Sequence, residues 1–144
     1  MAGWLPMYHD MGLVGNLMHP LSVGGELVFM PPLAFLQSPI RWLRMISSHG
    51  ATISGGPNFA FDLCWQRTTL QERQSLDLSR WQVAFNGAEP LRYETLKSFE
   101  TTFAPYGFSA TALCPCYGMA ETTLMVTGSR STEPWKSLAV ESHA

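Results

Sequence analysis

The sequence predicts an α/β fold in which a parallel or mixed sheet is flanked by helices. Short apolar runs of strand length alternate with longer segments whose apolar residues recur at helical spacing. The apolar runs do not alternate with polar residues, which is typical of strands covered on both faces. Two glycine-containing segments follow such runs, where the carboxyl ends of strands in an open α/β sheet bind ligands.

The predicted strands and helices follow one another in the order expected for βαβ units. We expect strands over 26–30, 51–54, 81–86 and roughly 112–116, and helices over 11–21, 39–48, 57–68 and 92–104. Ser38 is the expected N-cap of the second helix, with Pro39 at its first position. Gly55 and Gly56 are expected to form a flexible entry to the third helix, and Pro90 to start the fourth.

Composition argues against several partners and sites. A chain of 144 residues with 46% hydrophobic residues can form one packed core, and a net charge of −2 gives no basic surface for nucleic acid. No apolar run reaches the roughly 20 residues that a membrane span needs. Three cysteines without a secretory signal indicate reduced thiols and a cytoplasmic location. Cys114 and Cys116 lack the spacing of a zinc site.

The two glycine-containing segments, 86–90 and 116–121, indicate a nucleotide site. Tyr117 can stack on a planar base, and the carboxylate of Glu121 can hold Mg²⁺ that bridges phosphate oxygens. Gly87 and Ala88 permit close approach of the backbone to a flat ring. The alternative makes Tyr117 a core aromatic, Glu121 an exposed acid in the first turn of a helix, and 86–90 an ordinary βα turn.

Together with 4–13 and 54–60, these segments resemble the acyl-activating, adenylate-forming superfamily, and most closely its fatty acyl-AMP ligases. The resemblance extends from about Trp4 to Gly128. It implies that residues 1–128 are a partial slice of the large N-terminal AMP-binding domain of such an enzyme. Residues 129–144 are then an irregular tail at the start of a family-specific insertion.

The resemblance implies a reaction and a nucleotide site. A fatty acid reacts with ATP and Mg²⁺ to give an acyl-adenylate and pyrophosphate, and the acyl group passes to an acyl carrier protein or a polyketide synthase module. Tyr117 and Gly118 belong to the motif that stacks on adenine, and Glu121 to Mg²⁺ binding and catalysis. The adenine edge is lined by Gly87, Ala88, Glu89 and Pro90.

The resemblance also places residues on the acyl side. His9, as a catalytic and substrate-binding residue, and Asp10 line the pocket for the substrate carboxylate; Ser54, Gly55, Gly56 and Asn58 border the acyl tunnel. The alternatives are a structural His9 beside a helix-opening Asp10, and a common strand-to-helix turn at Gly55-Gly56-Pro57. Because adjacent residues do not share a helix face, we do not expect a direct contact between His9 and Asp10.

Several parts of the family pattern have no match in this sequence. These are the phosphate loop, the aspartate that holds the ribose and the lysine of the C-terminal domain. The start of the chain, which leads directly into a dense motif, is read as a truncation point, and we expect the isolated chain to be inactive. Two alternatives stay open: a piece of a fatty acyl-CoA ligase, and a non-catalytic nucleotide-binding, acyl-binding or interaction module.

Overall fold

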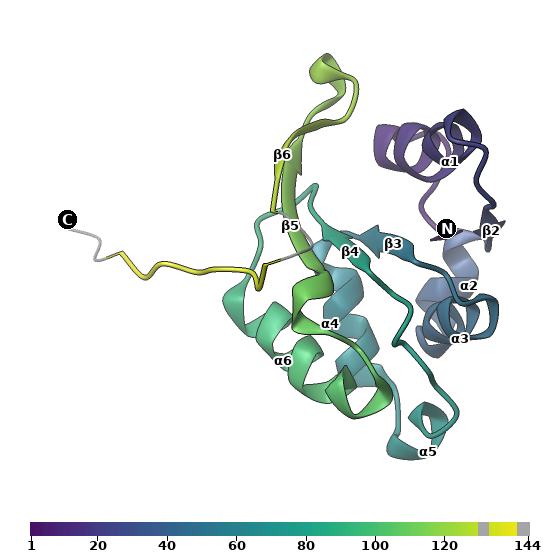
Figure 1. Cartoon of the computed structure of the whole chain (residues 1–144), viewed down its shortest axis with the longest axis vertical. Coiled ribbons are helices and arrows are strands. Elements are labelled where there is room, and N and C mark those ends of the chain that lie inside the picture. Colours follow the sequence, from purple (N-terminus) through teal and green to yellow (C-terminus); the bar gives the residue numbers. More distant parts are fainter. Residues whose placement is uncertain (130–132, 141–144) are drawn as a thin grey trace.

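The computed structural model describes residues 1–129 and 133–140 and confirms the α/β fold. Its main sheet has the strand order β3-β4-β5-β6, in which the first three strands are parallel and β6 is antiparallel to β5 (Figure 1). These strands are β3 (Ile53–Gly56), β4 (Val83–Asn86), β5 (Leu113–Gly118) and β6 (Met125–Gly128). A separate parallel pair joins β1 (Ala2–Gly3) to β2 (Val28–Phe29).

Helices follow most of the strands. On one face of the main sheet, α4 and α6 lie side by side, whereas the β5–β6 hairpin projects beyond the helices (Figure 1). Among the described residues, no helix is both long and apolar enough to cross a membrane. The helices are the π-helix η1 (Met11–Met18), α1 (His19–Ser22), α2 (Pro32–Gln37), α3 (Ile40–His49), α4 (Asn58–Arg67), α5 (Leu70–Arg73) and α6 (Tyr93–Phe103), with short 3-10 turns η2 (Ala104–Tyr106), η3 (Ala110–Ala112) and η4 (Ala120–Thr122).

The sequence located the four expected strands and four expected helices, but it missed the short elements. Strand β1 has two residues, α5 has four and α2 has six, so none is long enough for its apolar pattern to repeat. The predicted starts of two helices were wrong. Helix α3 begins after Pro39 without a side-chain cap, so Ser38 is not its N-cap, and α6 begins after Arg92 rather than at Pro90.

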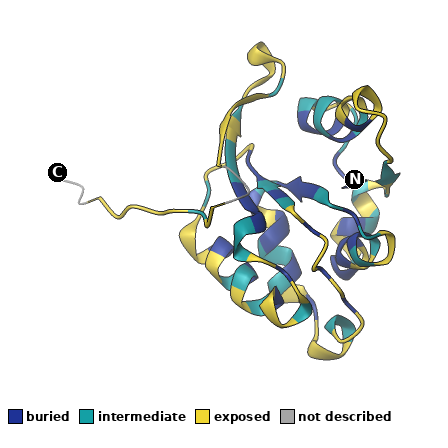
Figure 2. Cartoon of the chain, viewed as in Figure 1, coloured by how far each residue is buried: buried dark blue, intermediate teal, exposed yellow. Residues whose placement is uncertain are grey.

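The core is a continuous network of aromatic side chains between the sheet and the helices. Trp42 of α3 is fully buried, and its ring lies 5.5 Å from Trp81 and 5.7 Å from Phe61, measured between centroids. On the other side it contacts Trp4, which stacks on Phe35 at 4.0 Å. Figure 2 shows the buried residues gathered where the helices meet the sheet, whereas the β5–β6 hairpin is largely exposed.

Gly55 and Gly56 close strand β3 and are buried, so they are not the flexible entry that the sequence suggested. A Cβ atom at Gly55 would collide with the carbonyl oxygen and ring of Phe85 on the neighbouring strand. A Cβ atom at Gly56 would lie 2.9 Å from the indole of Trp4. The two glycines therefore make room for Phe85 and Trp4.

The chain after β6 has no regular element over residues 133–140. Trp135 nevertheless packs on Tyr93 of α6, with 5.4 Å between the ring centroids, and its indole nitrogen donates a hydrogen bond to Glu100 at 3.1 Å. The expected irregular tail therefore packs against α6 through Trp135. Residues 130–132 and 141–144 of that tail lie outside the described residues.

Candidate functional site

A cleft of about 870 Å³ lies between the main sheet, η1 and the β5–β6 hairpin. Its floor is the sheet face opposite α4 and α6. Because side chains alternate along a strand, residues at every second position point into the cleft. The side chains that form this floor are those of Ile53, Val83, Phe85, Cys114 and Cys116.

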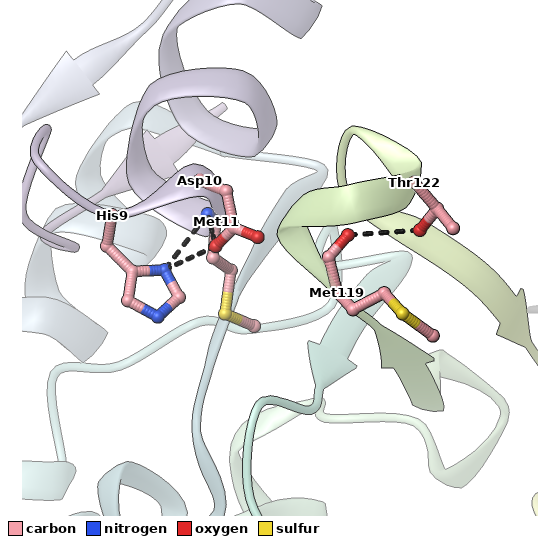
Figure 3. A network of polar contacts seen from close by, with 5 residues as sticks. All are labelled: His9, Asp10, Met11, Met119 and Thr122. Atoms are coloured by element: carbon pink, nitrogen blue, oxygen red, sulfur yellow. Dashed lines mark hydrogen bonds and ion pairs between the residues drawn. The ribbon is translucent and has the colours of Figure 1, made fainter.

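One wall of the cleft carries His9 and Asp10. His9 Nδ1 lies 2.6 Å from Asp10 Oδ1, and the same carboxylate oxygen accepts a hydrogen bond from the Met11 amide at 2.7 Å (Figure 3). The expectation of no direct contact was wrong because His9 lies in the bend before the helix, and only Asp10 caps it. Asp10 is therefore both the N-cap of η1 and the partner of His9.

The proton of His9 is assigned by the shorter of two contacts. The Met11 amide also approaches His9 Nδ1, at 3.1 Å, where it would need an unprotonated nitrogen. The Asp10 carboxylate, at 2.6 Å, is the closer partner of His9 Nδ1. The Met11 amide donates to the same carboxylate at 2.7 Å, so it does not need His9 as an acceptor. A proton on Nδ1 that is donated to Asp10 satisfies both groups and leaves Nε2 to act on a ligand.

The opposite side of the cleft is built from the two segments predicted to bind nucleotide. The cleft is lined by Gly87 and Ala88, which follow β4, and by Tyr117 and Gly118, which end β5. Tyr117 is 56% exposed, so it is not a core aromatic. Two segments that are separated by about thirty residues thus meet because β4 and β5 are adjacent parallel strands.

Two residues with strained backbone lie close to the cleft, one within the 86–90 segment and one just after the 116–121 segment. Among the described residues, Ala88 (φ 68°) and Thr123 (φ 74°) are the non-glycine residues with left-handed backbone. Such conformations cost of order 1–3 kcal/mol each and gather at binding sites, where the surrounding structure holds them. Ala88 lies in the loop after β4, and Thr123 in the turn between β5 and β6.

The turn between β5 and β6 begins at a crowded glycine. A Cβ atom at Gly118 would collide with the carbonyl group of Leu124 on the returning strand, beside an irregularity in the register. The turn itself is closed by a hydrogen bond from the Thr122 hydroxyl to the Met119 carbonyl oxygen at 3.0 Å, and it faces the His9 segment in Figure 3. Gly118 therefore fixes where the hairpin places Tyr117.

Seven of the predicted site residues lie outside the cleft lining. Ser54 is buried, and its hydroxyl donates to the Ala2 carbonyl oxygen at 2.7 Å and accepts from Trp42 Nε1 at 2.8 Å. Glu121 is an exposed acid in the first turn of η4, on the hairpin. A role in binding for these residues stays a prediction; the others are Gly55, Gly56, Asn58, Glu89 and Pro90.

Asn58 and Glu89 instead join α4 to the loop after β4. The Glu89 carboxylate accepts a hydrogen bond from the Phe59 amide at 2.6 Å. Asn58 is buried, and its side-chain oxygen accepts from the Arg92 amide at 3.2 Å. Both contacts satisfy backbone amides that would otherwise lack partners at the start of a helix.

Cys116 lies in the cleft floor as an un-ionised thiol. Burial, followed by the effect of Cys114, raises the pKa of Cys116 to about 11. The thiol donates a hydrogen bond to the Asn86 carbonyl oxygen. A thiol in this state is a poor nucleophile at neutral pH. Among the described residues, no group of three or more His, Cys, Asp and Glu side chains is arranged to hold a metal ion.

We expect Cys116 to react with iodoacetamide at pH 8 roughly a hundredfold more slowly in the folded chain than in urea, because its pKa lies above the ordinary thiol value of about 8.5. The rate should rise about tenfold per pH unit towards pH 11. For the same reason, this group lowers stability as the pH rises through that interval. Mass spectrometry of the labelled peptide measures the rate, with Cys116→Ser as the control. Equal rates in both states would contradict the prediction.

The apolar floor of the cleft was not predicted as part of the site. Phe85 and Cys114 lie in the strand runs that the sequence assigned to the sheet, and the pattern did not distinguish the cleft face from the core face. The available signal was position within the strand, because Ala84 and Leu113 are fully buried whereas the residues beside them line the cleft. The hairpin residues Met119 and Leu124 also line it and were missed.

Comparisons with known proteins identify the family. Residues 1–141 match the family of AMP-binding enzymes. The chain is 50% identical over 142 residues to a medium-chain-fatty-acid acyl-carrier-protein ligase, TtuA, of Teredinibacter turnerae, covering 98% of this chain and 22% of that protein. It is 48% identical over 141 residues to the ligase JamA of Moorena producens, which bears the same description, covering 98% and 24%.

The fold agrees with a solved structure of the same kind. The fatty acid AMP ligase from Legionella pneumophila superposes with a TM-score of 0.92 at 47% identity, over 94% of this chain and 24% of that one. This chain therefore spans about a quarter of the length of the proteins it matches. Because the family match covers nearly the whole chain, the chain belongs to the AMP-binding enzymes.

Proposed function

We propose that this chain is part of a fatty acyl-AMP ligase, which converts a fatty acid and ATP to an acyl-adenylate and pyrophosphate. The observation that carries the proposal is the convergence of 87–88 and 117–118 on one cleft, with His9 on the facing wall. The similar ligases named above act on fatty acids and acyl carrier proteins, which supports the same substrate and acceptor here. The acceptor is an acyl carrier protein, either free or within a polyketide synthase module, in the cytoplasm.

In this proposal the cleft holds the adenylate. Tyr117 is half exposed at the edge of the cleft, where its ring can stack on adenine, and the backbone of Gly87 and Ala88 lies along the edge of the base. Asp10 fixes the orientation of the His9 ring, so that Nε2, when it carries a proton, can donate a hydrogen bond to the substrate carboxylate. The apolar floor suits the alkyl part of the substrate, because it offers mainly hydrocarbon and sulfur atoms.

Mg²⁺ is part of the proposal, and Glu121 suits the binding of one such ion. The carboxylate of Glu121 is exposed on the turn of the β5–β6 hairpin, and Tyr117 lies near the end of β5 in the same hairpin. Mg²⁺ is commonly held by one or two carboxylates together with substrate phosphates, so a single carboxylate beside a nucleotide is sufficient. The ion would neutralise charge on the phosphates, and Glu121 would fix its place.

We expect the chain to bind a non-hydrolysable acyl-adenylate analogue, and Tyr117→Ala to weaken that binding roughly tenfold or more, because base stacking on an aromatic ring contributes about 1–3 kcal/mol. Isothermal titration measures both affinities after circular dichroism has confirmed folding. Tyr93→Ala is the matched control, since Tyr93 is a half-exposed tyrosine that packs on Trp135. A folded chain that fails to bind, or equal losses in both variants, would refute the adenylate site.

A further inference from the structure

The loop between β4 and α6 is attached to the start of α4 at two points. Glu89 Oε1 accepts a hydrogen bond from the Phe59 amide at 2.6 Å, and the Arg92 amide donates to Asn58 Oδ1 at 3.2 Å. These contacts lie on either side of Pro90 and Leu91, so both ends of this short stretch are anchored to α4. The position of the loop is therefore set by a helix on the far side of the sheet from the cleft.

The second anchor is itself held rigidly. Asn58 is 2% exposed, and its Nδ2 donates to Thr95 Oγ1 at 2.9 Å. The Thr95 hydroxyl donates in turn to Asp62 Oδ2 at 3.0 Å, and Asp62 Oδ1 accepts from Trp65 Nε1 at 3.0 Å. Because this network includes side chains of both α4 and α6, Asn58 has one orientation towards the loop.

The residue next to the first anchor is strained. Ala88 directly precedes Glu89 and has a φ of 68°, a conformation that a non-glycine residue keeps only when its surroundings hold it. Ala88 lines the cleft, whereas the Glu89 carboxylate reaches α4. Two adjacent residues therefore have different contacts: Ala88 lines the cleft, and Glu89 binds the start of α4.

We propose that Glu89 is a positioning residue for the nucleotide site. Its carboxylate holds the Phe59 amide, and this contact keeps Gly87 and Ala88 in the conformation that lines the cleft, with Asn58 as the second anchor. Glu89 thus acts on the nucleotide through the loop and does not touch it. The assignment rests on the proposed function of the cleft, and it gives the acid of the 86–90 segment a different role from its neighbours.

Three variants separate this role from a general loss of stability. Glu89→Ala removes the acceptor and should weaken binding of the acyl-adenylate analogue about five- to tenfold, as expected for the loss of one charge-assisted hydrogen bond. Glu89→Gln keeps an acceptor oxygen and should bind within about threefold of the unmodified chain. Adding Ala88→Gly to Glu89→Ala should restore most of the affinity, because glycine adopts positive φ without strain.

The experiment combines amide hydrogen exchange of the unliganded chain with titration of the analogue. Glu89→Ala should accelerate exchange at Phe59 and over residues 87–89, while Glu94→Ala, which alters another exposed glutamate five residues further on, should leave both readings unchanged. The assignment is overturned if exchange in the loop is unaffected by Glu89→Ala, or if the loop loosens and affinity does not fall. It is also overturned if Ala88→Gly restores nothing.

The two readings also separate this proposal from the function on which it rests. If the unmodified, folded chain does not bind the analogue, the proposed function fails, and the nucleotide role of the loop fails with it. The exchange measurement needs no ligand, so it still decides whether Glu89 holds the loop. A loop that loosens in Glu89→Ala and binds more weakly, with recovery in the double variant, supports both.

Discussion

Replacing Trp42 with alanine is expected to lower the free energy of unfolding by about 3–5 kcal/mol, the usual cost of truncating a large buried aromatic side chain. Trp42 is fully buried and contacts Trp4, Phe35, Phe61 and Trp81, so its loss leaves a cavity at the centre of the aromatic network. The substitution also removes the indole donor to the Ser54 hydroxyl. Since the free energy of unfolding of a small domain is only about 5–15 kcal/mol, this substitution removes a large part of the stability.

Urea denaturation followed by circular dichroism measures the effect of Trp42→Ala. Trp135→Ala is the matched control, because Trp135 is a partly exposed tryptophan that packs against the outside of α6. We expect the control to lose less than about 1.5 kcal/mol, in line with the ordinary range for substitutions outside a core. Similar losses in the two variants would mean that the aromatic network does not centre on Trp42.

Replacing Gly118 with alanine is expected to abolish measurable binding of the acyl-adenylate analogue while the helical core stays folded. The new Cβ atom would overlap the Leu124 carbonyl group, so β5 and β6 have to separate at this point. Tyr117 precedes Gly118 and pairs with Thr127, and it would move with the strand. A displacement of about 1 Å at a binding group is enough to lose roughly a hundredfold in function.

Gly25→Ala provides the control for Gly118→Ala. A Cβ atom at Gly25 has its nearest neighbour at 3.4 Å, the Pro20 carbonyl oxygen, which is ordinary contact. This variant should bind the analogue as the unmodified chain does. Titration and far-ultraviolet circular dichroism of both variants decide the question: intact binding by folded Gly118→Ala would show that the hairpin adjusts without moving Tyr117.

The sequence predicted the long elements well because each carries its own periodic pattern. Helix α6 shows the apolar spacing of Leu96, Phe99 and Phe103, and all three are buried. The elements that it missed depend on contacts with distant residues. Strand β1, for example, has only two residues and exists because it pairs with β2 across some 25 residues of intervening chain.

The candidate site was predictable where the residue type alone is informative. Tyr117 and Gly87 were singled out by their chemistry, and they do line the cleft. Glu89 was grouped with its neighbours because the sequence cannot tell which way a side chain leaves a loop, and here it reaches the start of α4. The contact of His9 with Asp10 was missed because the argument from helix faces does not apply to His9, which lies in the bend before the helix.

The alternation of side chains in β4 has a consequence for how this protein can vary. Val83 and Phe85 face the cleft, whereas Ala84 and Asn86 face the interior. Deleting one residue within the strand would exchange the two sets, placing an amide in the cleft and a phenyl ring where a methyl group fits. Homologues with other substrates should therefore differ here by substitution at alternate positions, and changes in chain length should fall in exposed connections such as 23–26, between α1 and β2.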